Sequence, residues 1–415
     1  MDESDFIGHL TGELKHAADG SYRYFQPHEL PFDWDYSRET LNIISAASTE
    51  IARLDGMLRF MDGGLREMMV MNLSLMESVS SSSIEGIRST TDRLLRSERT
   101  KKSDPKLVSD RQEIFNYRKA LLQGFEEVPV GGAITIDTIK SLHRTLMDGV
   151  RGSDNSPGEF KTHQNAIGRS SDTLETAKMV PAPPESVDHL LDNWLDYVNS
   201  TRFETVEKAA IAHYQFEAIH PFRDGNGRVG RLLLMLMLRR DGLLKHPVLF
   251  LSGYLNLRRD RYIDLMYAVS TRDALDEWVE FISRGLYEQA MSTAGIVISL
   301  FEYRERLLSD AEDLNETRLI EMLFRNPYVA SGDVVSELGV SAPTANKLLK
   351  RLEEKGIVME TTGKERNRLY LADGIIEMLN VGRPTIDTES MSGLKAKEHL
   401  IFKSVLVHGV SNDDR

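Results

Sequence analysis

The stretch His-Pro-Phe-Arg-Asp-Gly-Asn-Gly-Arg-Val-Gly-Arg, residues 220–231, decides how the rest of this chain is interpreted. It combines an imidazole, a carboxylate, a glycine-flanked asparagine and two arginines, and the apolar run Leu232–Leu238 follows directly. A glycine-rich loop that opens onto a helix presents free backbone N–H groups and the positive end of the helix dipole. The stretch therefore predicts a phosphate-binding site at the start of a helix.

Four side chains of this stretch have the chemistry that a phosphate site needs. Arg228 and Arg231 are three residues apart, so they share one helix face and can bind successive phosphates. Asp224 is a natural ligand for Mg²⁺, which usually binds through one or two carboxylates plus phosphate oxygens. His220 is the candidate general base, because an unperturbed imidazole titrates near neutral pH.

Residues 225–230 also match the dinucleotide pattern G-x-G-x-x-G. That pattern is meaningful only after a strand in a βαβ unit. Here a helical segment, Glu207–Ile219, precedes it, and the proline after His220 ends that helix at the histidine. A Rossmann-type nicotinamide site is therefore rejected, whereas the phosphate site stands.

The composition limits the classes of function. The chain has 415 residues, a formal net charge of −13 and no cysteine. The negative charge argues against non-specific binding to nucleic acid or anionic membranes as the main role, and disulfides and thiolate chemistry are excluded. The start of the chain lacks the pattern of a secretory signal, and the apolar runs are too short to span a membrane. We expect a cytoplasmic protein of about two or three domains without membrane association.

Helical periodicity dominates the chain from Glu39 to about residue 300, after an irregular arm that ends near residue 35. Pro157–Gly168 and Ala177–Pro184 interrupt the helices with short, partly alternating segments that predict an inserted β-hairpin. The predicted fold class is all-α with this small hairpin. His213, in the helix before the loop, is interpreted as structural.

The segment Thr317–Leu371 has the order of a winged helix-turn-helix, with helices at Ser331–Leu338 and Ala342–Lys355 and two short strands near Gly363. Its recognition helix and wing are rich in basic residues: Lys347, Lys350, Arg351, Lys364, Arg366 and Arg368. Contact with DNA and a role in dimer or protein contacts remain equal alternatives for this unit.

A run of four serines, residues 80–83, weakens the end of an N-terminal helix, and Gly86 suits the left-handed position just past that end. Glu85 is unusual there, because an acid in the last turn opposes the helix dipole. It should therefore have a cationic partner elsewhere in the fold.

His220–Arg231 resembles the signature of the Fic family, H-x-F-x-[D/E]-G-N-G-R-x-x-R, at every specified position. The hairpin resembles the target-docking flap of that family, and residues 24–96 resemble the helical region that precedes many Fic cores. The resemblance covers roughly residues 20–375. It divides the chain into an N-terminal helical region with an inhibitory helix, a catalytic core with its flap, a helical linker, the winged helix and a tail: residues 1–104, 105–300 (flap 157–181), 301–316, 317–375 and 376–415.

The resemblance implies a protein adenylyltransferase that moves AMP from ATP to a Tyr, Thr or Ser hydroxyl of a target protein, with Mg²⁺ as cofactor. His220 would accept the proton of the attacking hydroxyl, and Asp224 would hold Mg²⁺. The family's remaining nucleotide contacts map onto these residues: Gly225, Asn226 and Gly227 around the phosphates, Arg228 toward the β-phosphate, Arg231 toward the γ-phosphate, and Ile167 and Tyr262 near the nucleotide. Glycines at 225 and 227 favour nucleotide transfer over the kinase-like activity of the Doc branch.

The pattern Ser81-x-x-x-Glu85-Gly86 is similar to the inhibitory motif of the family, in which the glutamate pairs with the second motif arginine. This implies that Glu85 binds Arg231 and displaces the γ-phosphate. Modification of the protein by itself and a homodimer are compatible with the resemblance. Two other functions remain open: a DNA-binding regulator with the Fic core as sensor, and removal of AMP instead of its addition.

Overall fold

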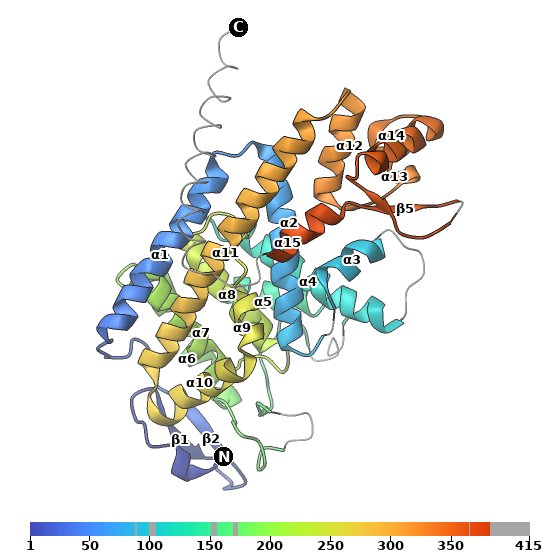
Figure 1. The fold of residues 1–415 in the computed structure, drawn as a ribbon. Coiled ribbons are helices and arrows are strands. Elements are labelled where there is room, and N and C mark those ends of the chain that lie inside the picture. The colour runs from blue at the N-terminus through green and yellow to red at the C-terminus, as the bar shows by residue number, and fades with distance from the viewer. Residues whose placement is uncertain (88, 99–104, 151–155, 169–172, 365, 382–415) are drawn as a thin grey trace. The chain divides into compact units, whose positions relative to one another are not determined.

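The computed structural model describes residues 1–87, 89–98, 105–150, 156–168, 173–364 and 366–381 (Figure 1). These residues are mostly helical with a few short strands, as the sequence predicts. No helix among them is long and apolar enough to cross a membrane. The chain forms two compact units, of which the first is Met1–Asp55, Glu77–Ile87 and Gln112–Ala290, and the second is Gly56–Met76, Arg88–Arg111 and Met291–Arg415.

The core of the first unit is built on α7 (Thr205–Ile219) and α8 (Asn226–Arg240), which pack extensively against each other (Figure 1). Helix α6 (Val187–Asn199) covers α7, and α5 (Ile136–Leu146) covers α8. All residues of the apolar run 232–238 are buried. Because residues 232–238 of α8 are apolar on all sides, this helix lies inside the unit, and the loop 220–225 is held between two buried helices.

The N-terminal residues contain a two-stranded antiparallel sheet of β1 (Gly12–His16) and β2 (Arg23–Pro27). The expectation of an irregular arm was therefore wrong for these residues. Phe25 on β2 is completely buried, and its N–H donates to the carbonyl of Val180 over 2.8 Å. An isolated two-stranded hairpin is marginal in water, so distant contacts of this kind stabilise it, and local periodicity does not reveal them.

The remaining helices of the N-terminal and central parts of the chain lie mostly in the region where the sequence predicts helical periodicity. They are α1 (Arg38–Arg59), α2 (Gly63–Ile84), α3 (Thr91–Glu98), α4 (Pro105–Glu127), α9 (Leu251–Leu257), α10 (Arg259–Arg272), α11 (Leu275–Ser309) and the 3₁₀ turns Glu3–Asp5 and Pro184–Ser186. The first part of the helical linker expected at residues 301–316 is the continuation of α11, because neither glycine nor proline interrupts the chain near residue 300.

A winged helix-turn-helix occupies the C-terminal part of the second unit, as predicted. Its elements are α12 (Leu314–Arg325), β3 (Tyr328–Ala330), α13 (Ser331–Leu338), α14 (Ala342–Glu354), β4 (Met359–Glu360) and β5 (Leu369–Leu371), followed by α15 (Asp373–Val381). The three strands form a sheet in the order β3-β5-β4. Gly339 ends α13 with a φ of +69°, and the Ser341 side chain caps α14, so local sequence signals set this turn.

The flap, residues 157–181, is less regular than a hairpin of two strands. In its described residues one antiparallel bridge pairs Ile167 with Met179, and the N–H of Ile167 donates to the carbonyl of Met179 over 2.8 Å. The expected strands are thus reduced to a single bridge. Prolines at 157 and 181 border this segment, and proline cannot donate to a strand ladder.

Candidate active site

The loop begins where α7 ends at His220, which adopts the left-handed conformation with φ 51° and ψ 60°. This confirms the prediction that the helix ends at the histidine. The His220 Nδ1 lies 3.3 Å from the Glu217 carbonyl oxygen. Because a carbonyl only accepts, Nδ1 carries the hydrogen, and Nε2 is left as the basic nitrogen. Burial, together with the nearby charge of Lys161, lowers the pKa of His220 to about 3, so the ring is neutral.

Helix α8 begins at Asn226, inside the stretch 220–231. Gly225 precedes it with a φ of +79°, which suits glycine. The Phe222 N–H donates to the Asn226 Oδ1, and the Asn226 Nδ2 donates to the Phe222 carbonyl, both over 2.8 Å. These bonds close the loop, and the backbone N–H groups in the first turn of α8 have no partner inside the helix. The N-terminal turn of α8, with Asn226 and Gly227, therefore has the backbone donors that an anion needs.

His143 on α5 holds the loop from one side. Its Nδ1 accepts a hydrogen bond of 2.8 Å from the Gly158 N–H, and its Nε2 donates to the Asp224 carbonyl over 3.0 Å. The ring stacks on Phe222 with centroids 3.7 Å apart. Phe222 is completely buried, so it anchors the loop in the core. Burial lowers the pKa of His143 to about 4, which is consistent with a neutral ring that links the flap to the loop.

The flap holds the backbone around His220 through two side chains. The Lys161 ammonium donates to the Ile219 carbonyl over 3.1 Å and to the Asn165 side-chain oxygen over 3.0 Å. The Lys161 N–H donates to the Pro221 carbonyl over 2.8 Å, and the Asn165 amide donates to the Phe222 carbonyl over 2.9 Å. Burial lowers the pKa of Lys161 to about 7. The carbonyls on both sides of His220 are thus fixed by the flap.

Arg231 is bound by the end of helix α2. Its Nε donates to the Ser81 hydroxyl over 2.9 Å, and its Nη2 donates to the Ser81 carbonyl and to the Glu85 carboxylate, at 3.1 and 2.8 Å. A Cβ built on Gly227 would lie 2.8 Å from the same Glu85 oxygen. The Glu85 carboxylate therefore lies against the first turn of α8, where an anion is expected.

The charges around Glu85 favour its ionised form. Burial raises the pKa of Glu85, but Arg231, with Arg228 and Arg259, outweighs this effect, and the net shift is downward. The Arg259 guanidinium also donates to the Ile84 carbonyl over 2.8 Å at the end of α2, and Gly86 follows with a φ of +90°, as predicted. The Glu85 side chain remains 39% exposed, whereas that of Arg231 is 2% exposed. The acid can therefore be reached by solvent, but its partner is buried.

Arg228 has a separate partner in α4. Its Nη1 donates to the Glu113 carboxylate over 3.1 Å, and both side chains are almost completely buried. Each of the two loop arginines is thus paired with a carboxylate from a helix N-terminal to the core helices. The sequence predicted that both arginines bind phosphate, and it did not predict the pair with Glu113.

Asp224 is exposed at the outer edge of the loop, and one of its oxygens accepts a hydrogen bond of 2.6 Å from the Gly225 N–H. The described residues contain no group of three or more His, Cys, Asp or Glu side chains that could hold a metal ion. One carboxylate beside a phosphate site matches Mg²⁺, which takes its other ligands from phosphate and water.

The two other predicted nucleotide contacts, Ile167 and Tyr262, lie in different parts of the fold. Ile167 lies in the flap, half-buried, at its bridge to Met179. Tyr262 on α10 is 2% exposed, and its hydroxyl is 2.7 Å from the His213 Nε2. His213 is itself buried, in agreement with its interpretation as a structural residue.

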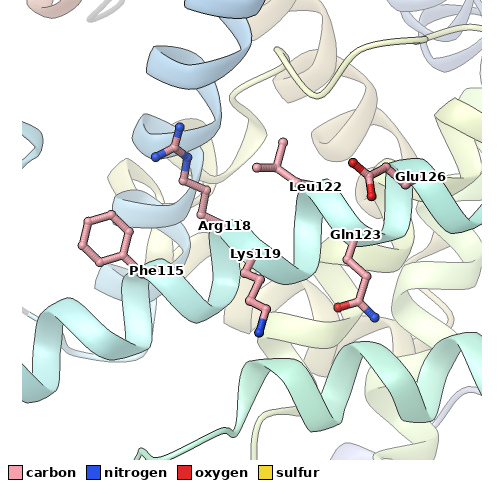
Figure 2. A pocket seen from close by; sticks show the side chains of 6 residues that line it. All are labelled: Phe115, Arg118, Lys119, Leu122, Gln123 and Glu126. Atoms are coloured by element: carbon pink, nitrogen blue, oxygen red, sulfur yellow. The ribbon is translucent and has the colours of Figure 1, made fainter. Parts of the chain in front are cut away.

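A hollow of about 430 Å³ lies elsewhere, along helix α4 (Figure 2). All of its lining residues come from this one helix: Phe115, Arg118, Lys119, Leu122, Gln123 and Glu126. It contains none of the loop residues, and a single helix with outward-pointing side chains lacks the convergent polar groups of a catalytic pocket.

Sequence reasoning missed five side chains that contact the loop or its neighbours: Glu113, His143, Lys161, Asn165 and Glu217. Two weak signals were available. Lys161 and Asn165 both follow the Pro-Gly pair at the start of the flap, and Glu217 stands three residues before His220. The other two lie far from the loop in sequence, where no local pattern marks them.

Three family models match the chain. Residues 133–238 match the Fic/DOC family, residues 41–126 match the N-terminal region of the Fic/DOC family, and residues 312–359 match a winged helix-turn-helix DNA-binding model. Residues 133–238 form a Fic domain. The flap, the loop and most of α8 lie inside it, and α2 with Ser81 and Glu85 lies inside the Fic N-terminal match.

Proteins similar to the Fic domain include a protein adenylyltransferase of Caenorhabditis briggsae, 37% identical over 112 residues, which are 26% of this chain and 20% of that protein. A probable protein adenylyltransferase of Aquifex aeolicus is 49% identical over 71 residues, 16% of this chain and 22% of that protein. The chain thus spans about a fifth of the length of these relatives. A Fic family protein from Desulfovibrio desulfuricans has a similar fold, with a TM-score of 0.52 and 20% identity, covering 82% of this chain and 97% of that one.

Proposed function

We propose that this protein is a protein adenylyltransferase that moves AMP from ATP to a hydroxyl side chain of a target protein. The observation that carries the proposal is the position of a neutral imidazole, His220, one loop away from a helix N-terminus with two buried arginines. The curated relatives of the Fic domain are named protein adenylyltransferases, which supports the same reaction.

The chemistry follows from this arrangement. The His220 Nε2 accepts the proton of the target hydroxyl while the hydroxyl oxygen bonds to the α-phosphorus, and the bond from the α-phosphorus to the bridging oxygen breaks to release pyrophosphate. The backbone of Gly225, Asn226 and Gly227 holds the phosphates, and Arg228 and Arg231 neutralise the β- and γ-phosphates. Phosphoryl-group transfer depends on such positioning and charge neutralisation more than on covalent help from the protein.

Asp224 would hold Mg²⁺ at this site. Its exposed carboxylate has a second oxygen without a hydrogen bond to any described residue, which fits an ion that binds through one carboxylate and phosphate oxygens. The ion would neutralise charge on the phosphates. The protein itself supplies the orientation, since His143 fixes the Asp224 carbonyl.

Glu85 is proposed as an inhibitor of the reaction. Its carboxylate binds Arg231 and lies against Gly227, so it competes with the γ-phosphate for the same guanidinium and helix terminus. A nucleotide can then bind with its γ-phosphate out of place, and the α-phosphorus is not aligned for attack.

The test is to incubate the full chain with a panel of nucleotides and Mg²⁺ and to measure its mass and that of proteins mixed with it. Addition of one AMP from ATP, lost in His220→Ala, is expected. This assay also detects modification of the protein by itself. Addition of phosphate alone would indicate kinase-like transfer, and loss of AMP from a modified protein would indicate the reverse reaction. No nucleotide-dependent mass change with any nucleotide would refute the proposal.

DNA binding by the winged helix is a second candidate function. The model that matches residues 312–359 is a DNA-binding one, and five basic side chains on α14 and the wing are exposed: Lys347, Lys350, Lys364, Arg366 and Arg368. Arg351 was expected among them, but it is bound to Asp313 and Glu316 of the adjoining α12 segment, at 2.8 and 3.1 Å. Its side chain stabilises the unit instead of facing a phosphate backbone.

Salt-dependent binding of the full chain to duplex DNA tests this candidate. Lys347→Ala with Lys364→Ala should weaken binding and reduce the salt dependence, because each phosphate contact releases a counterion. Arg351→Ala should lower thermal stability without that change in salt dependence. DNA affinity that is equal in both variants and wild type would exclude the recognition helix and wing as the contact surface.

A further inference from the structure

Glu217 is a buried acid beside His220 that the proposed chemistry does not use. It lies on the last turn of α7, and its carboxylate oxygen Oε2 is 3.8 Å from the His220 Nδ1. Its side chain is 11% exposed, and Oε1 has no hydrogen-bond partner among the described residues. A buried carboxyl without a full set of partners destabilises a fold, so its presence next to a catalytic base points to a role in function.

The charged and titratable groups around Glu217 come from each helix packed against it. Arg231 is on α8 and Glu85 at the end of α2, and both change its pKa. His213 is on α7 and Tyr262 on α10, and burial, followed by the charge of Glu217, raises the pKa of Tyr262. Glu217 therefore experiences the charges of the Glu85–Arg231 pair and also lies next to the base.

The backbone of α8 is adapted to this carboxylate. A Cβ built on Gly230 would lie 2.3 Å from the Glu217 Oε1 and 3.2 Å from the His213 Nδ1. Glycine inside a helix is unfavourable by about 1 kcal/mol relative to alanine. Gly230 lies in the buried part of α8, where it leaves the space that the Glu217 carboxylate occupies.

We infer that Glu217 is a positioning residue for the base: its ionised carboxylate stabilises the imidazolium that His220 becomes when it accepts the target's proton. This rests on the proposed function. A neutral His220 held by burial and by Lys161 is a weak base, whereas a base is most effective when its pKa lies near the working pH. A negative charge 3.8 Å from Nδ1 favours the protonated ring and so makes Nε2 a stronger base.

The state of Glu217 connects the inhibitory pair to the base. The pKa of Glu217 is raised to about 8, chiefly by burial and also by the charge of Glu85, against the opposing effect of Arg231. At neutral pH with Glu85 in place the carboxyl is therefore largely protonated and carries no charge toward His220. When Glu85 leaves Arg231, the arginine acts on Glu217 without its competing charge, and the acid ionises at lower pH.

The experiment measures kcat and KM for ATP against pH in the full chain, in the wild type, Glu85→Gly, Glu217→Gln and Glu217→Asp. We expect kcat to rise as Glu217 ionises, at lower pH in Glu85→Gly than in wild type. Glu217→Gln should lose this rise, with kcat about tenfold lower at the upper end and KM within about twofold, as expected for a group acting only in the transition state. Glu217→Asp keeps an acid and should retain the rise.

Glu207→Gln is the matched control, since Glu207 lies on the same helix, is raised in pKa by burial and bonds to Tyr36. An equal loss in this control, or an unchanged pH profile in Glu217→Gln with normal transfer, would overturn the inference alone. Absence of His220-dependent AMP transfer from every protein in the set would overturn the proposed function, and the inference with it.

Discussion

Replacement of Glu85 should activate the protein, and the size of the effect follows from the geometry of its pair with Arg231. The two side chains meet at 2.8 Å, with Arg231 2% and Glu85 39% exposed. Breaking a fully buried pair costs about 3–5 kcal/mol, whereas a surface pair contributes about 0–1 kcal/mol. Because more than a third of the Glu85 side chain is in solvent, we expect its ion pair with Arg231 to contribute about 1–2 kcal/mol, between the values for surface and buried pairs.

Since about 1.4 kcal/mol corresponds to a factor of ten, Glu85→Gly should raise the rate of AMP transfer about tenfold. Glu85→Gln should give a smaller increase, because its amide oxygen can still accept from Arg231 although its charge is gone. Arg231 should stay in place in both variants, since Ser81 holds it through two further hydrogen bonds.

The assay follows transfer of labelled AMP from ATP to the protein itself and to added target proteins. Glu67→Gln is the control, because Glu67 is an exposed acid on the same helix α2 and lies outside the Ser81-x-x-x-Glu85 pattern. Equal rates in wild type and Glu85→Gly would refute the competition for Arg231. An equal increase in Glu67→Gln would show that net charge alone, not the pair, accounts for the activation.

Three further predictions concern the supports of the loop. Glu113→Gln leaves the buried Arg228 without its counter-charge, so thermal stability should fall and ATP with Mg²⁺ should recover more of it than in wild type; an unchanged melting temperature would contradict this pairing. Burial lowers the pKa of His143 from 6.5 to about 4, so the unfolded chain binds this proton first and stability falls as pH drops from 6.5 toward 4. His143→Gln should flatten that part of the stability profile measured by chemical denaturation, and a profile parallel to wild type would exclude the effect. Gly230→Ala should destabilise by about 1–3 kcal/mol through its clash, whereas Gly56→Ala on α1, with open space around its Cβ, should stabilise by up to about 1 kcal/mol; equal effects would show that crowding at Gly230 is not decisive.

Much of the fold could be predicted from the sequence because helix ends and turns depend on residues that are close together in the chain. The Pro221 signal ends α7 at the histidine, and Gly339 with Ser341 sets the turn of the winged helix. The left-handed Gly86 was also predicted correctly. The N-terminal sheet was not, because two short strands without clean alternation depend on contacts such as Phe25 with Val180.

The same division applies to the candidate site at residues 220–231. The sequence by itself determined which residue types stand in the loop, and its unpaired acid at 85 indicated a distant cation, because helix dipoles and backbone donors depend only on neighbours along the chain. Only the tertiary structure decided that Glu85 reaches Arg231, that Glu113 holds Arg228, and that Glu217 lies beside His220. These three pairings depend on which helix faces pack against each other in the folded chain. The pKa values of the buried groups depend on the same packing, because burial and neighbouring charges set them.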